Sequence, residues 1–183
     1  MDDDRPLFFH VMAYADDADR DVVDMVSGNP DWEPPAALRD GIREFADAPA
    51  ADYQYPPSEG DADLRAELAA RHDVPVERVV VTNGAGEANH LAMACGLEAH
   101  SGNEVILTDP VYPYYAGRTE LLDAEAVYVP VADDGTLDPA DVRAAASDDT
   151  ALVVACSPNN PTGAVYGEEV KRELTAIAEE HDA

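Results

Sequence analysis

The sequence predicts an α/β fold in which a mostly parallel sheet is flanked by helices. Three observations support this: 183 residues suffice for a sizeable core, 46% of them are apolar, and short β-branched runs alternate with helical stretches. Strands that alternate with helices usually pair in parallel, because each helix carries the chain back across the sheet. The runs predicted as strands are Arg78–Thr82, Glu104–Thr108, Ala126–Val131 and Ala151–Cys156.

The first part of the chain is predicted to hold one amphipathic helix. Residues 1–32 lack sustained periodicity, and the acidic stretch 16–24 is expected to be partly mobile up to a turn-forming cluster at 27–30. A helix is predicted over 34–48, because two prolines suit its first turn and apolar residues then recur at spacings of four and three. These apolar residues are Leu38, Ile42 and Phe45.

A loop rich in tyrosine and proline, 53–60, precedes a second helix for which Asp61 is the predicted N-cap. Leu64 and Leu68 share one face of this helix. The helices predicted farther along the chain are 86–99, 113–123, 138–146 and 167–181. The last of them shows Val170, Leu174 and Ile177 in helical register.

The charge of the chain limits its partners. There are 39 Asp and Glu against 11 Lys and Arg, a formal net charge of −28, which would repel nucleic acid and anionic lipid. The acids are spread along the whole chain, which favours a surface solvated in high salt over an acidic tail or a partner-binding face. Because concentrated salt screens such repulsion, we predict halophilic adaptation.

The sequence suggests no metal site, disulfide framework or membrane segment. Cys95 and Cys156 lack a C-x-x-C spacing and are predicted to be small core residues. No apolar run approaches the roughly 20 residues that span a bilayer. The acidic N-terminus has the wrong charge for a signal peptide, so the protein is expected to be cytoplasmic.

Ligands of open α/β sheets gather at loops that follow the carboxyl ends of strands. The first such loop, 82–87, reads Thr-Asn-Gly-Ala-Gly-Glu and opens a helix, so its backbone amides and the helix N-terminus suit a phosphate. A tight turn that needs glycine only for its geometry is the simpler interpretation. A more specific alternative is a dinucleotide-binding site, which requires the motif G-x-G-x-x-G. Asn89 stands where its third glycine is needed, which argues against this alternative.

Two more loops follow predicted strands. In 109–115, Asp-Pro-Val-Tyr-Pro-Tyr-Tyr, one tyrosine could stack on a flat heteroaromatic ring, whereas core packing is preferred for Tyr114 and Tyr115. In 157–163, Ser-Pro-Asn-Asn-Pro-Thr-Gly, two prolines restrict the loop and present the Asn160 amide as a donor to a ligand oxygen. Asx–Pro turns are common, so this motif alone is only moderately specific.

The three loops, in this order, resemble those of the class I/II aminotransferases of fold type I, which depend on pyridoxal phosphate. Upstream pieces agree: Ser27-Gly28-Asn29-Pro30 followed by two prolines, and Tyr55-Pro56-Pro57 followed by Gly60. The resemblance covers nearly the whole chain from about Gly28, and it leaves the dinucleotide hypothesis without a match beyond G-x-G. It implies the N-terminal part of the large domain of such an enzyme, with 1–50 contributing to the small domain and 51–183 to the cofactor-binding domain.

Carried over residue by residue, the resemblance implies a site for pyridoxal 5′-phosphate. The backbone amides of Gly84, Ala85 and Gly86 would hold the phosphate, Tyr112 would stack on the ring, and Asn160 would donate to its phenolic oxygen. Tyr55 would reach the phosphate of a neighbouring subunit, which implies a homodimer. Gly28 would line the pocket for an amino acid or a 2-oxo acid.

Transamination also needs a lysine amine, and Lys171 is the only lysine of the chain. It is predicted to be an exposed helix residue paired with acidic neighbours. In the family the catalytic lysine, the acid that pairs with the pyridinium nitrogen and the carboxylate-binding arginine all come later. The resemblance therefore implies a truncated aminotransferase with no catalytic residue present, inactive alone. A non-catalytic cofactor-binding or dimerising remnant, and a lyase or synthase of the same fold, remain alternatives.

Overall fold

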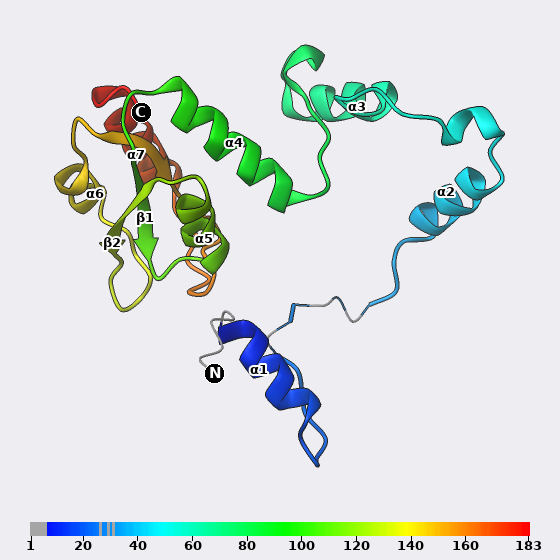
Figure 1. Ribbon diagram of the computed structural model, residues 1–183, viewed down its shortest axis with the longest axis horizontal. Coiled ribbons are helices and arrows are strands. Elements are labelled where there is room, and N and C mark those ends of the chain that lie inside the picture. Colours follow the sequence, from blue (N-terminus) through cyan, green and yellow to red (C-terminus); the bar gives the residue numbers. More distant parts are fainter. Residues whose placement is uncertain (1–6, 26, 29, 31) are drawn as a thin grey trace. The chain divides into compact units, whose positions relative to one another are not determined.

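The computed structural model describes residues 7–25, 27, 28, 30 and 32–183 (Figure 1). Contacts divide the chain into two units, residues 1–55 and 56–183. All predicted strands and the three predicted ligand loops belong to the second unit. No helix within the described ranges is both long enough and apolar enough to cross a membrane.

The first unit contains α1 (Leu7–Asp16), α2 (Ala36–Ala46) and a short 3₁₀ helix, Ala50–Tyr53. Helix α2 confirms the predicted amphipathic helix, but it begins after the two prolines, with Pro35 as its N-cap, and ends two residues earlier than predicted. Tyr53 donates its hydroxyl to the Phe45 carbonyl at 2.7 Å. Helix α1 is not predicted, because its sequence is apolar almost throughout and so shows no contrast between two faces. In the predicted turn at 27–30, Asn29 lies outside the described residues.

The second unit is built on a sheet of three parallel strands in the order β2-β1-β3. The strands are β1 (Glu104–Asp109), β2 (Glu125–Pro130) and β3 (Thr150–Val154). Three of the four predicted strands therefore exist, with ends within two residues of the prediction. The predicted α/β class with a mostly parallel sheet is confirmed.

Strand β1 lies at the centre of the core because its side chains are apolar toward both faces of the sheet. On one face, Val105 and Leu107 pack with Met93. On the other, Ile106 packs with Val142 and with further core residues from the elements that follow β2. Each of these β1 side chains is at most 2% exposed.

Helices cover both faces of this sheet, as the sequence predicts. They are α4 (Ala85–Ala99), α5 (Pro113–Leu121), α6 (Pro139–Ala145) and α7 (Glu168–Glu180), preceded by α3 (Ala62–His72) and a 3₁₀ turn, Val76–Arg78. Residues of α4 and α5 pack on the face that carries Val105, while α6 and α7 pack on the face that carries Ile106 (Figure 1). Asp61 is the N-cap of α3, as predicted, and accepts a hydrogen bond from the Leu64 amide at 2.9 Å.

The predicted strand Arg78–Thr82 is wrong. Val79 has extended backbone angles, φ −110° and ψ 123°, but no strand in the described ranges pairs with it. Strand β1 already has a neighbour on each side. The segment is held instead by the Arg65 guanidinium, which donates to the Val79 carbonyl at 2.8 Å, and by the Val81 amide, which donates to the Glu59 carbonyl at 2.9 Å.

The prediction that both cysteines are core residues is also wrong for Cys95, which is exposed on α4. Two residues earlier, Met93 is 4% exposed and packs on the sheet. Because two residues turn a helix by about 200°, Cys95 faces away from the sheet. Cys156, just after β3, is half-buried.

Candidate functional site

The glycine loop, residues 82–87, ends an unpaired segment and opens α4. Gly84 is the N-cap, with φ 82° and ψ −179°, a conformation that is essentially restricted to glycine. Glu87 reaches back so that its Oε2 accepts hydrogen bonds from the Asn83 amide at 2.6 Å and from Asn83 Nδ2 at 3.1 Å. This exchange resembles a capping box and fixes how the chain enters the helix.

Three consecutive N–H groups at the start of α4 are available to a ligand. Within the described part of the chain, those of Ala85, Gly86 and Glu87 donate to no backbone or side-chain acceptor, whereas Gly84 N already donates to the Thr82 carbonyl at 2.8 Å. A cluster of free amides at the positive end of a helix is a general anion-binding arrangement. A Cβ at Gly84 would meet no atom within 4 Å, so the space before the helix is open. These features fit a phosphate group.

Arg118 of α5 joins the glycine loop to the next loop along the site. Its Nη2 donates to the Gly86 carbonyl at 2.9 Å, and its Nη1 donates to the Tyr114 carbonyl at 3.1 Å. The guanidinium carbon also lies 5.2 Å from the centre of the Tyr114 ring. No local sequence pattern marks Arg118, because its contact with Gly86 spans 32 residues.

The tyrosine loop, residues 109–115, follows β1 and leads into α5, with Tyr112 as N-cap and Pro113 in the first turn. The Tyr112 ring centre lies 4.8 Å from that of Tyr114 and 6.4 Å from that of Tyr115. Burial, together with the neighbouring Tyr114, raises the pKa of the Tyr112 phenol, so it is neutral at physiological pH. An aromatic face supported on two sides is a suitable surface for ring stacking.

The two remaining tyrosines of this loop behave differently. Tyr115 packs with the β1 core, and its hydroxyl accepts a hydrogen bond from Asn89 Nδ2 at 3.3 Å, which confirms the predicted core role. Tyr114 is 49% exposed and contacts Tyr112 and Arg118, so core packing is wrong for this residue. Its neighbour Tyr115 packs against the β1 core, and because one residue turns a helix by about 100°, Tyr114 lies off that face.

The asparagine loop, residues 157–163, follows β3. Asn160 is exposed in a turn, which leaves its side-chain amide free for a ligand, while Asn159 is 3% exposed. Asn159 Nδ2 donates to Thr162 Oγ1 at 3.0 Å within the loop and to the Pro110 carbonyl at 3.3 Å in the tyrosine loop. Asn159 therefore links the two loops, a role that no local sequence pattern indicates.

The structure brings five of the predicted site residues to one end of the sheet: Gly84, Ala85, Gly86, Tyr112 and Asn160. The links are Arg118, from the glycine loop to the tyrosine loop, and Asn159, from the tyrosine loop to the asparagine loop. Tyr55 and Gly28 belong to the first unit, so their assignment stays a prediction. Tyr55 is fully exposed, and Gly28 has φ 60°.

Lys171 lies on α7 and points to solvent, with a side chain that is 48% exposed. Its Nζ lies 2.9 Å from Glu168 Oε1, one turn earlier on the helix. This hydrogen bond and the ammonium charge lower the pKa of Glu168. The predicted exposed and paired lysine is confirmed.

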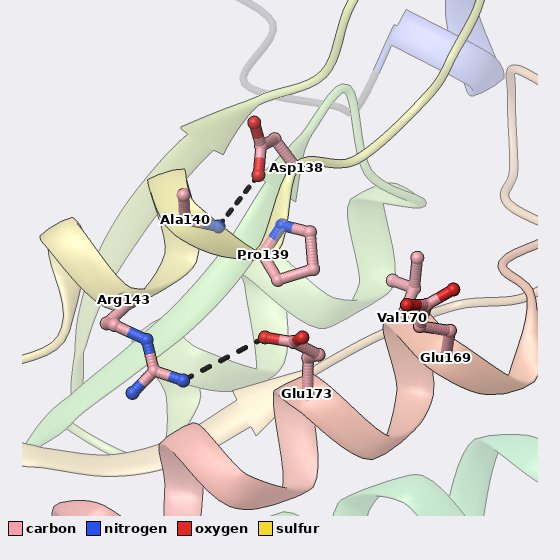
Figure 2. A pocket seen from close by; sticks show the side chains of 7 residues that line it. All are labelled: Asp138, Pro139, Ala140, Arg143, Glu169, Val170 and Glu173. Atoms are coloured by element: carbon pink, nitrogen blue, oxygen red, sulfur yellow. Dashed lines mark hydrogen bonds and ion pairs between the residues drawn. The ribbon is translucent and has the colours of Figure 1, made fainter.

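A separate pocket of about 300 Å³ lies between α6 and α7 (Figure 2). Arg143 crosses it toward α7, where its Nη2 is 4.0 Å from Glu173 Oε2 and its Nη1 pairs with Glu180. None of the residues that line this pocket belongs to the three loops. The described residues also contain no group of three or more His, Cys, Asp or Glu that could hold a metal ion.

Comparison with known proteins gives a consistent result. The family model "Aminotransferase class I and II" matches residues 20–183. An aspartate aminotransferase of Pyrococcus horikoshii is 30% identical over 170 residues, which are 88% of this chain and 42% of that protein. A histidinol-phosphate aminotransferase of Halorubrum lacusprofundi is 37% identical over 155 residues, 83% of this chain and 40% of that protein.

Among solved structures, an N-succinyldiaminopimelate aminotransferase of Mycobacterium tuberculosis superposes with a TM-score of 0.86 and 30% identity. The match covers 98% of this chain and 48% of that one. The predicted fold, the early part of such an enzyme's sheet and helices, is therefore confirmed. The chain spans about two fifths of the length of the curated relatives it matches.

Proposed function

Because this chain belongs to the class I and II aminotransferases, whose members use pyridoxal 5′-phosphate, we propose that its second unit binds that cofactor for the transfer of an amino group between an amino acid and a 2-oxo acid. The observation that carries the proposal is the row of free amides at Ala85, Gly86 and Glu87, joined through side-chain contacts to Tyr112 and Asn160. Fold likeness alone would not carry a function.

Each loop has a distinct task in this proposal. The amides at the start of α4 bind the phosphate, and Gly84 contributes its conformation more than its N–H, which already has an acceptor. Tyr112 packs against the ring, and the Asn160 amide donates to the phenolic oxygen. The bound cofactor supplies an electron sink for the substrate, while these residues orient its ring and exclude water from one face.

Lys171 is not proposed as the catalytic amine. Its ammonium is exposed, paired with Glu168 and carried by α7, whereas the three loops lie at the carboxyl end of the sheet. A catalytic lysine instead needs a place beside the reacting carbon. We therefore propose that these 183 residues bind the cofactor but do not transaminate by themselves. The exposed position of Lys171 and its pairing with Glu168 also favour a second candidate function, a unit that binds the cofactor without catalysis.

Further parts of the proposal concern the whole protein. Tyr55 would contact the cofactor phosphate of a partner subunit in a homodimer, and Gly28 would line the substrate pocket. Residues 1–50 would belong to a small domain and 51–183 to the cofactor-binding domain. The acidic composition supports a protein that works in a salt-rich cytoplasm, with no nucleic acid or membrane partner.

The test compares cofactor forms that differ only in the phosphate. In equilibrium dialysis of the 183-residue chain, pyridoxal 5′-phosphate is expected to bind at least about tenfold more tightly than pyridoxal. Borohydride treatment followed by peptide mass spectrometry should leave Lys171 mostly unmodified. Equal affinity for the two compounds would contradict the phosphate site. Stoichiometric modification of Lys171 would contradict the proposal that this lysine does not bind the cofactor covalently. K171A is the matched control for the modification.

A further inference from the structure

Arg118 is held by neutral partners beside the first turn of α4. Arg39, Arg43, Arg65 and Arg143 each form an ion pair with a carboxylate, whereas other described arginines form none. Within the described residues Arg118 forms none, although the chain has 39 Asp and Glu. Its guanidinium instead donates to two neutral carbonyl oxygens, those of Gly86 and Tyr114. Its positive charge is therefore not neutralised by a direct partner, and it lies at the first turn of α4.

The contact with Gly86 bears directly on the free amides. The Gly86 carbonyl and the Glu87 N–H belong to the same planar peptide group, so a donor that fixes the oxygen also fixes the direction of the N–H. A charged donor further polarises that peptide, which makes its N–H a stronger donor. Arg118 thus acts on an anion through the peptide that binds it.

Two neighbouring residues support this role. A Cβ at Gly86 would lie 3.2 Å from Arg118 Nη2, so glycine there allows the guanidinium its close approach. Glu87 places a carboxylate in the same first turn, where it opposes a bound anion. The charge of Arg118 offsets that repulsion at short range.

We infer that Arg118 is a positioning residue for the anion-binding amides of the glycine loop and raises their affinity for a phosphate group. This inference rests on the proposed function, which supplies the phosphate as that of pyridoxal 5′-phosphate. It assigns the phosphate selectivity of the site to a side chain of α5 that lies outside the glycine loop itself.

The experiment uses the 183-residue chain and its variants R118M, R118K and R143M. R143M is the control, because it also replaces an arginine by methionine, but on α6, where the arginine is paired with carboxylates. Affinities for pyridoxal 5′-phosphate and for pyridoxal are measured by equilibrium dialysis. R118M should weaken binding of the phosphorylated form at least about tenfold and change binding of pyridoxal less than about twofold. R118K, which keeps the charge without the two-pronged donor, should fall between. R143M should match the wild type.

A second measurement separates this inference from the proposed function. Amide nuclear magnetic resonance spectra are titrated with inorganic phosphate, and the shifts of Ala85, Gly86 and Glu87 are followed. The inference predicts that R118M needs about tenfold more phosphate than wild type for the same shifts. If wild type shows these shifts but does not prefer pyridoxal 5′-phosphate over pyridoxal, the proposed function fails, while a tenfold weaker response of R118M to inorganic phosphate still supports the inference. Unchanged phosphate affinity in R118M, or an equal loss for both cofactor forms, overturns the inference.

Discussion

Gly84 shows how one backbone conformation supports the anion site. Replacing it with alanine should cost about 1–3 kcal/mol, because φ 82° with ψ −179° is strained for any residue that carries a Cβ. No atom lies within 4 Å of that added Cβ, so the cost comes from the backbone alone. Urea unfolding of G84A measures it.

Gly86→Ala is the control for this prediction. Gly86 is helical, and the added Cβ meets only the flexible end of Arg118 at 3.2 Å. Displacing that guanidinium from the Gly86 carbonyl should offset the gain of about 1 kcal/mol that alanine brings in helix propensity. G86A should therefore be close to neutral in stability, and equal losses in the two variants would refute the conformational explanation.

Asn159 offers a second prediction at the scale of single residues. N159A removes the donor that serves Thr162 Oγ1 and the Pro110 carbonyl in a site that is 3% exposed. Losing two hydrogen bonds made by a buried amide, each worth about 0.5–1.5 kcal/mol, should cost about 1–3 kcal/mol in urea unfolding. N103A is the matched control, since Asn103 also donates to a backbone carbonyl, that of Asp123, but at an exposed position. A smaller loss in N159A than in N103A would contradict this role.

The pH dependence of stability should report the burial of Tyr115. Burial, with Cys156 acting in the same direction, raises the pKa of this phenol, while the hydrogen bond from Asn89 opposes the rise. A raised pKa in the folded state means that stability is fully present below the unfolded value near 10 and falls as pH rises through the folded value. Y115F should therefore lose less stability than wild type between about pH 8 and about pH 11. Equal losses in urea titrations would contradict the assignment.

Residues whose chemistry is visible in a local motif could be predicted from the sequence, whereas residues that act across the fold could not. Gly84, Tyr112 and Asn160 stand in short motifs after extended runs, so their placement could be predicted. Arg118 and Asn159 act on carbonyls 32 and 49 residues away, and such partners depend on which loops the sheet brings together. The roles of Gly28 and Tyr55 depend on how the first unit lies, so they remain predictions.

Among the elements, helices were predicted most closely where a cap and an apolar face agree. Helices α4 to α7 match their predicted ranges within two residues at each end. Residues 78–82 differ because a β-branched run predicts extended backbone, whereas a strand also needs a hydrogen-bonded neighbour. Helix α1 was missed for the opposite reason, since a helix that is apolar on most sides has no periodic signal.

The cap of α6 gives a prediction at this scale. Asp138 Oδ1 accepts a hydrogen bond from the Ala140 amide at 2.8 Å (Figure 2). D138A should lower the free energy of unfolding by about 1 kcal/mol, because a first-turn amide of α6 loses its acceptor. D141A, in the first turn of the same helix, removes an equal charge without a cap and should cost less than about 0.5 kcal/mol. Equal losses of stability for D138A and D141A in urea unfolding would mean that Asp138 acts through its charge and not through the capping hydrogen bond.

For the molecule as a whole, the net charge of −28 predicts a strong response to salt. Raising potassium chloride from about 0.1 M to about 1 M shortens the screening length from about 10 Å to about 3 Å, which weakens repulsion among the carboxylates. The thermal unfolding midpoint should therefore rise by several degrees. Choline chloride at equal ionic strength is the control and should act similarly. A midpoint that stays constant or falls would argue against charge repulsion as a limit on stability.

The glycine loop differs from the other two loops in how it is anchored. The tyrosine and asparagine loops continue from paired strands, whereas the segment before the glycine loop is held by the Arg65 side chain and by one backbone bond to Glu59. Such a segment can open locally at a lower free energy than the sheet needs to unfold. We expect the tyrosine and asparagine loops to keep their positions while the glycine loop opens and closes. Phosphate binding would then use part of its free energy to hold that loop closed, and the association rate would depend on how often the loop is closed.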